Sequence, residues 1–405
     1  MSDERDIYYD ERTFGDLSYM WDSACSLLFS DDDFYERPLS NVHPIVRKVL
    51  RDWHQDPVVR YLYAPAAKVR RRLEAQGYTR EKCAALWERE YARHLARLEE
   101  LRGAGYDEFN AEIDAQKGLS YEAWEARNTS QSKEQFETYI KWGGLQHFNF
   151  ADTFASVAME IDFHKPKAIW TDLSSLYPDE FDVGLSLHAN LERNPPGVDL
   201  IETTGPVLIL TEGTSDTKIL STAIKAMYPE FADMYEFVDF EEFKIEGGAS
   251  PLTKMVRAFA GVRMTQRIIA LFDNDAAGLE QKALLDKGRL PQSIRIMTLP
   301  DATIGKRYPT LGPEGLRIMD INGAACSIEL FLGRAALSDE NGNLRPVRWS
   351  SWNKAASRYQ GELENKNAAT AEFLIAVKSG ATPPQLRRRF KDMDGLLKAI
   401  FAGFN

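Results

Sequence analysis

The chain has 405 residues, of which 44% are hydrophobic and 27% are charged, so it is long enough for two or three domains with cores of their own. No stretch approaches the length of a membrane-spanning apolar segment, and the acidic start (residues 1–4) is unlike a secretion signal, so we expect a cytoplasmic protein that binds no membrane. Three widely separated cysteines, Cys25, Cys83 and Cys326, argue against a disulfide framework and a zinc ribbon. Any bound metal is therefore expected to be a hard ion.

The formal net charge of −11 looks unfavourable for a protein that binds phosphates. The imbalance is local, because residues 1–34 carry ten acidic residues against two arginines. Basic clusters occur at 68–72 and at 387–391. Each is read more readily as a solvated helix face than as a phosphate-binding track.

The first two hundred residues predict a mainly helical domain. Helical composition extends over 68–101, with a break near Gly77, and again over 121–142 and 148–161. The many aromatic residues of this part are expected to fill a helical core. Two prolines and a glycine within 194–197 cannot continue a helix, so we place the end of a first domain, 1–196, there.

Two later segments, 207–216 and 268–278, carry most of the functional information. Each begins with an apolar run typical of a buried parallel strand and ends abruptly in acidic residues. Chemistry in open α/β sheets lies just past the carboxyl ends of such strands, so the acidic side chains are expected to converge. These side chains are Glu212, Asp216, Asp273 and Asp275. Clustered carboxylates repel each other unless a cation neutralises them, which predicts a site for one or two Mg²⁺ or Mn²⁺ ions.

The elements around these two segments predict the rest of an α/β domain. Helical spacing covers 215–227, a strand is expected over 235–240, a helix follows Pro251, a short helix covers 279–286 and a last strand covers 294–299. This order predicts a four-stranded parallel sheet flanked by helices. Beyond it, 337–349 predicts a hairpin around Asn341-Gly342, followed by a small helical C-terminal region that completes the domain over 336–405.

A strand ending in Glu-Gly and a second ending in Asp-x-Asp, with a glycine three residues on, resemble the Toprim domain over 203–335. The variant Glu212-Gly213-Thr214-Ser215-Asp216 is similar to that of the overcoming-lysogenization-defect nucleases. The resemblance implies that Asp216 joins the metal shell and that Glu329, in an Ile-Glu-Leu-Phe context, supplies a second metal position. It also implies a lysine near the scissile phosphate, for which Lys366 is the candidate and Lys354 the competitor.

The stretch 68–79 resembles the N-terminal domain of the HEPN/Toprim proteins found in bacterial defence loci. HEPN ribonucleases use an arginine and a histidine separated by four to six residues, a spacing that Arg89 and His94 satisfy. Arg47 with His54 and Arg37 with His43 satisfy it as well, so the spacing discriminates little. A pair on a helix surface is therefore the favoured interpretation of Arg89 and His94.

These observations together predict a metal-dependent nuclease, with DNA favoured over RNA as its substrate. The resemblance alone adds a role in antiphage defence. We also expect a homo-oligomer. No Gly-x-x-x-x-Gly-Lys-Ser/Thr motif occurs, so an ATPase or sensor would have to be a partner protein. Two alternatives remain open: a metal-independent HEPN-type ribonuclease with a regulatory Toprim half, and a non-catalytic sensor of nucleic acid or nucleotides that recruits another effector.

Overall fold

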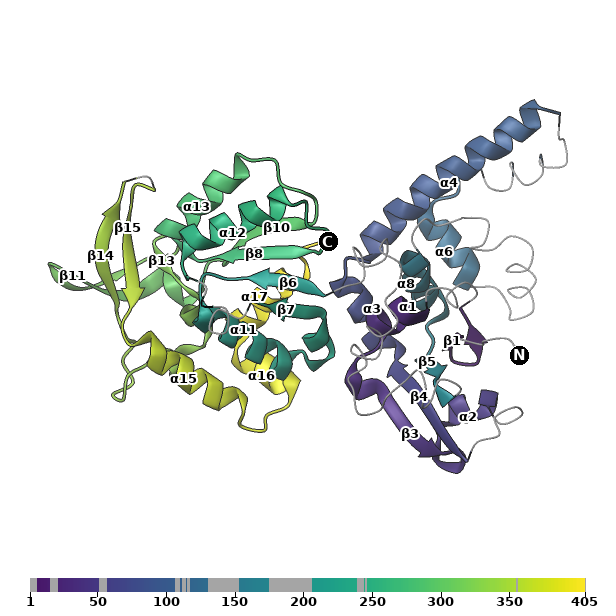
Figure 1. The fold of residues 1–405 in the computed structure, drawn as a ribbon, viewed down its shortest axis with the longest axis horizontal. Coiled ribbons are helices and arrows are strands. Elements are labelled where there is room, and N and C mark those ends of the chain that lie inside the picture. Colours follow the sequence, from purple (N-terminus) through teal and green to yellow (C-terminus); the bar gives the residue numbers. More distant parts are fainter. Residues whose placement is uncertain are drawn as a thin grey trace. The chain divides into compact units, whose positions relative to one another are not determined.

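The computed structural model describes residues 6–14, 21–50, 57–105, 110, 114, 117–129, 153–174, 206–238, 244, 246–354 and 356–404. The chain forms two compact units, Met1–Pro196 and Gly197–Phe404 (Figure 1). The break predicted at 194–197 and the predicted helix beyond residue 129 lie outside the described residues.

Unit 1 contains an antiparallel sheet with the strand order β2-β1-β5-β4-β3. Its strands are β1 (Ile7–Tyr9), β2 (Arg12–Thr13), β3 (Phe34–Pro38), β4 (Val58–Pro65) and β5 (Ala168–Asp172). This sheet corrects the prediction of a mainly helical domain. The strands are short, and β1 pairs with β5 from the far end of the unit, so the local sequence carries little of the pairing information.

The helices of unit 1 agree better with prediction. The helical stretch expected over 68–101 is present as α3 (Ala66–Ala75) and α4 (Arg80–Gly103), separated by a turn in which Gly77 has a φ of 92°. Thr79 begins α4 by accepting a hydrogen bond from the backbone N–H of Lys82 at 3.2 Å. The remaining helices are α1 (Trp21–Leu28), α2 (Pro44–Leu50), α6 (Tyr121–Thr129) and α8 (Thr153–His164), with 3-10 turns at Asp31–Asp33 and Leu39–Asn41.

Two residues of the basic cluster 68–72 make structural contacts inside unit 1. The sequence had suggested either a solvated helix face or a phosphate-binding track. Lys68 donates to both carboxylate oxygens of Asp33 at 2.8 Å. Arg72 is fully buried and donates to the carbonyl of Leu27 at 2.9 Å. Partnered in this way, these two cations hold α3 to the preceding segment and are unavailable to phosphate.

Unit 2 is built on a four-stranded parallel sheet, as predicted, and its strand order is β10-β8-β6-β7. Its strands are β6 (Val207–Leu210), β7 (Tyr235–Phe237), β8 (Ile268–Phe272) and β10 (Ile294–Thr298). The connecting helices are α11 (Thr214–Met227), α12 (Ala249–Gly261) and α13 (Ala276–Asp286), with a 3-10 turn at Pro229–Met234. All five residues of β8 are buried, which explains why that strand lacks apolar–polar alternation.

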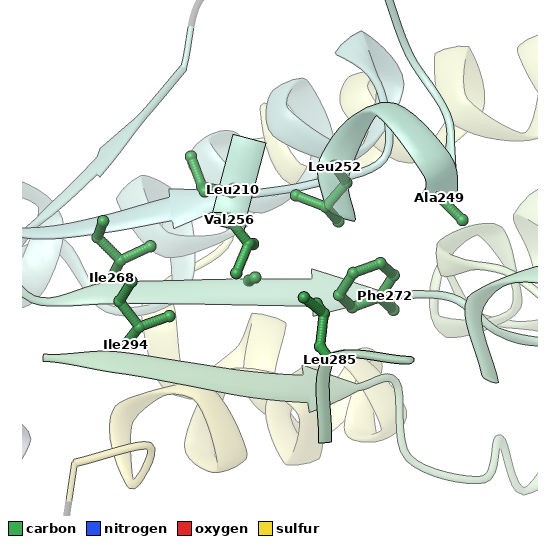
Figure 2. Close-up of a cluster of buried hydrophobic side chains, with 9 residues drawn as sticks. Leu210, Ala249, Leu252, Val256, Ile268, Phe272, Leu285 and Ile294 are labelled. Carbon is green, nitrogen blue, oxygen red and sulfur yellow. The ribbon is translucent and has the colours of Figure 1, made fainter. Parts of the chain in front are cut away.

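Helices cover both faces of this sheet. On one face, alternate residues of β8 pack against α12 and α13 in a cluster that Figure 2 shows around Val256, Phe272 and Leu285. On the other face, Ile269 lies against the C-terminal helix, where a Cβ added to Gly403 would approach its side chain at 2.8 Å. The central strands are thus enclosed, and their carboxyl ends are fixed in position.

Two smaller sheets adjoin the parallel sheet. One is two-stranded and pairs β9 (Asn274–Asp275) with β13 (Ala325–Cys326). The other has the order β12-β11-β14-β15, and its strands are β11 (Tyr308–Gly312), β12 (Gly315–Met319), β14 (Val347–Asn353) and β15 (Arg358–Leu363). The hairpin predicted at 337–349 is present only as a short antiparallel bridge between Ser338 and Leu344 around Asn341-Gly342, with a backbone hydrogen bond from Arg345 to Leu337 at 2.9 Å. The longer hairpin of this region is formed by β14 and β15.

The C-terminal region is helical from Lys366 onwards. It consists of α15 (Lys366–Val377), α16 (Pro383–Arg389) and α17 (Lys391–Phe401), all of which contact α11. Short helical turns at Ile304–Arg307, Ile328–Phe331 and Arg334–Leu337 connect the sheets. Among the helices that the structure describes, none combines the length and the apolar character needed to cross a membrane.

Candidate active site

Glu212 and Asp273 lie just beyond the carboxyl ends of β6 and β8, two adjacent parallel strands. The carboxylate of Glu212 accepts a hydrogen bond from the backbone N–H of Asp273 at 2.9 Å, so the two strand ends are directly joined. Asp216 occupies the first turn of α11, the helix that follows β6. All three side chains are partly exposed, so this edge of the sheet is open to a ligand.

Asp275 is held from two sides. One carboxylate oxygen caps α13 by accepting from the backbone N–H of Gly278 at 2.7 Å. The other accepts a hydrogen bond from the side-chain NH₂ group of Gln360 on β15. The side-chain oxygen of Gln360 in turn accepts a hydrogen bond from the backbone N–H of Ala277 at 3.1 Å. Gln360 therefore clamps Asp275 in place, a role that the sequence analysis missed because no local pattern links β15 to α13.

Glu329 and Lys366 approach the same site from the C-terminal side. Glu329 is 3% exposed, in the helical turn Ile328–Phe331, and accepts from the hydroxyl of Ser327 at 2.6 Å. Lys366 begins α15 and forms an ion pair with Glu362. Burial alone would lower the pKa of Lys366, but Glu362 raises it, with smaller contributions from Glu329 and Asp216. None of the described contacts joins the competing residue, Lys354, to these carboxylates.

The carboxylates disfavour each other's ionised forms. Burial, with the charges of Asp275 and Asp216, raises the pKa of Glu212 to about 8. Burial and the charge of Glu329 raise the pKa of Asp216 to about 7. Burial raises the pKa of Asp273 well above its ordinary value, and the other four carboxylates all add to the effect. The five predicted acidic residues thus share one electrostatic environment that is short of positive charge.

Two glycines allow the backbone to close tightly around these side chains. A Cβ added to Gly278 would lie 2.2 Å from the carbonyl oxygen of Asp273 and 3.1 Å from the Glu212 carboxylate. A Cβ on Gly247 would lie 2.9 Å from the carbonyl oxygen of Glu212. Both contacts are too short for any larger residue, so the glycines are required by close approach.

The donor set fits a hard divalent cation, because Mg²⁺ and Mn²⁺ prefer carboxylate oxygens and would supply the missing positive charge. In the part of the chain that the structure describes, no three or more His, Cys, Asp or Glu side chains are grouped as a metal site. Two hydrogen bonds help to keep these carboxylates apart: the Glu212 side chain is turned toward the backbone N–H of Asp273, and the Asp275 side chain is turned toward the N-terminus of α13. An ion would compete with those hydrogen bonds.

Arg89 and His94 lie in the middle of α4. Residues five apart on an α-helix point about 140° away from each other around its axis, so the two side chains do not face a common substrate. Arg89 also pairs with the neighbouring Glu90 at 3.1 Å, as does Arg93 at 2.8 Å. This arrangement favours the helix-surface interpretation of the pair.

We compared the chain with protein-family models, with curated proteins and with solved structures, and it matches none of them. The functional argument therefore rests on the residues of this chain.

Proposed function

We propose that this protein is a divalent-metal-dependent nuclease that hydrolyses phosphodiester bonds. The observation that carries the proposal is the pair Glu212 and Asp273, placed at the ends of adjacent parallel strands with three more carboxylates in electrostatic contact. The resemblance of the sequence to Toprim domains supports the same reaction class. It is also the sole basis for a role in antiphage defence. The preference for DNA over RNA and an ATPase or sensor partner are part of the same proposal.

We assign separate roles in the reaction to the residues of the site. Glu212, Asp216, Asp273, Asp275 and Glu329 would hold one or two Mg²⁺ or Mn²⁺ ions. When bound, such an ion polarises the phosphate and makes a water molecule more acidic. If only one ion binds, Glu212 is the natural general base.

Lys366 would stabilise the negative charge that develops on the leaving oxygen. Its amino group is within electrostatic reach of Asp216 and Glu329. Its exposed ion pair with Glu362 has side-chain exposures of 46% and 65%, and such exposed pairs contribute roughly 1 kcal/mol or less. A phosphate could therefore replace Glu362 as the partner of Lys366 at little cost.

The test is cleavage of plasmid DNA and of total RNA by the purified chain with Mg²⁺, Mn²⁺ or EDTA. We expect cutting that requires the metal and that disappears in the double variant Asp273→Ala, Asp275→Ala. RNA cleavage that persists in EDTA would refute the proposal in favour of a HEPN-type ribonuclease, with Arg89→Ala as its check. Binding without cutting under every metal condition would point instead to a sensor.

A further inference from the structure

The hairpin of β14 and β15 carries an exposed aromatic surface. Trp352 and Tyr359 lie opposite each other in the register of the two strands, and they are 51% and 54% exposed. Their ring centroids are 4.9 Å apart and their planes are inclined at 78°. Large aromatic side chains exposed together are uncommon on a protein surface and usually mark a binding site.

A third ring extends this surface along the hairpin. The register shift between Trp349 and Ser351 puts Trp349 on the same face as Trp352, and its ring centroid is 6.1 Å from that of Tyr359. The opposite strand makes room for it, because a Cβ added to Gly361 would lie 2.8 Å from the Trp349 ring. The three rings form one aromatic face on the hairpin.

The hairpin is positive although the chain is strongly negative. Residues 347–363 contain three cations, Arg348, Lys354 and Arg358, and one acid, Glu362, which gives a net charge of +2 against −11 for the whole chain. Arg348 pairs with Glu364, and Arg358 donates to the backbone carbonyl of Gly323 at 3.0 Å, both on the strand face opposite the rings. The hairpin therefore combines an apolar aromatic face with a net positive charge elsewhere on its strands. A nucleic-acid strand, which has flat apolar rings on an anionic backbone, complements this combination.

The opposite face of the hairpin is fixed to the carboxylate site. Gln360 clamps Asp275, and Asn353 donates to Glu280 of α13 at 2.9 Å. At the base of the hairpin lies an open cavity of about 630 Å³, lined by Arg348, Trp349, Asn365 and Lys366 among others. A ligand on the aromatic face would therefore have a path past Lys366 toward the carboxylates. Figure 1 shows the hairpin extending away from the parallel sheet.

We propose that the β14–β15 hairpin binds an unpaired segment of nucleic acid, whose bases stack on Trp349, Trp352 and Tyr359, and guides it into the carboxylate site. The segment must be unpaired, because bases inside a duplex are already stacked and cannot offer a face to a side chain. This inference rests on the proposed nuclease function and adds the substrate class. DNA and RNA strands both offer flat bases on an anionic backbone, and the binding experiment below distinguishes between them.

The experiment measures binding of labelled oligothymidylate, oligouridylate and a matched DNA duplex by fluorescence anisotropy, at low salt and in EDTA so that no cleavage occurs. The full chain is compared with Trp352→Ala, Tyr359→Ala and the double variant. We expect a single substitution to raise the Kd for the single strands about tenfold, the loss of one stacked base. The duplex is expected to bind more weakly, and the ratio of the two single strands identifies the preferred sugar.

Two controls isolate stacking from folding. Ile375→Ala removes another exposed apolar side chain, 73% exposed on α15, and should leave binding unchanged. Trp352→Phe keeps a ring and should retain most of the affinity. Because both aromatic side chains are exposed, the melting temperatures of all variants should equal that of the original chain.

The outcomes separate the hairpin proposal from the nuclease proposal. Weaker binding by the alanine variants, in a chain that never cuts, supports the hairpin and refutes the nuclease. Metal-dependent cutting with unchanged single-strand binding by the double variant refutes the hairpin and leaves the nuclease standing. Equal losses for duplex and single strand would refute stacking. Stacking would also be refuted if the double variant bound single strands as before but sedimented with a smaller mass than the original chain. That result would show that the aromatic face is a contact between protein chains.

Discussion

Raising the pH of the metal-free protein is expected to destabilise unit 2, because Glu212 has a folded-state pKa of about 8 against an ordinary value of 4.5. A carboxyl group with a raised pKa binds its proton more tightly in the folded protein. It therefore stabilises the fold below pH 4.5 and loses that contribution as the pH rises through 8. Asp216, with a pKa of about 7, acts in the same direction.

The size of the effect follows from linkage. Each pH unit within the window costs about 1.4 kcal/mol per group, so moving from about pH 5.5 to about pH 8 would cost about 3.5 kcal/mol for a fully buried Glu212. Since the side chain is partly exposed, we halve the value to about 2 kcal/mol. For a unit of this length, that free energy lowers the melting temperature by about 4 to 8 °C.

The assay is differential scanning calorimetry in EDTA across this pH range, comparing the original chain with Glu212→Gln. Glutamine can still accept the hydrogen bond from the Asp273 amide but does not ionise, so the variant should melt with a shallower pH dependence. Asp286→Asn is the matched control, because Asp286 pairs with Lys282 at 2.6 Å on the exposed end of α13. Saturating Mg²⁺ should restore the melting temperature at pH 8 and have little effect near pH 5.5, where protons compete for the carboxylates.

Parallel pH profiles for the original chain and Glu212→Gln would refute the electrostatic account of the site. The same conclusion would follow if Mg²⁺ raised the melting temperature equally at both ends of the pH range.

Three further results are expected. Gly278→Ala would push a Cβ to 2.2 Å from the carbonyl of Asp273 and should destabilise unit 2 by roughly 3 kcal/mol or more in urea unfolding; a loss below about 1 kcal/mol would show that the loop relaxes freely. Gln360→Ala should reduce metal-dependent cleavage about tenfold to a hundredfold, as for other residues that orient a ligand, while circular dichroism shows an intact fold; unchanged cleavage would deny it a positioning role. Asp33→Ala would leave the partly buried Lys68 with Ser30 but without its carboxylate partner and should cost roughly 2 to 3 kcal/mol in chemical denaturation of unit 1, whereas a neutral outcome would mean that Lys68 reaches solvent.

The parallel sheet of unit 2 could be predicted because its signals are local. Each apolar run in the sequence became one strand, and the acidic residues at the ends of two runs could be placed on neighbouring strands by the rule for parallel sheets. The helices between them had clear spacing, and α11 begins within one residue of its predicted start.

The other sheets could not be predicted, since their pairing is set by contacts between distant segments. In unit 1, β1 pairs with β5 across most of the unit's sequence. In unit 2, the turn signal Asn341-Gly342 did lie within an antiparallel bridge, but the longer hairpin joins β14 to β15, which carry no comparable local signal. The clamp that Gln360 places on Asp275 depends on that hairpin and was hidden for the same reason.

Direct metal binding tests the central claim most closely: titration calorimetry of the purified chain with Mn²⁺ near pH 8, beside Asp273→Asn. We predict saturable binding of one or two ions by the original chain, weaker binding at about pH 6 as the carboxyl groups take up protons, and loss of binding in the variant. The absence of saturable binding by the original chain, or equal binding by Asp273→Asn, would contradict the assignment of this carboxylate cluster as a metal-dependent active site.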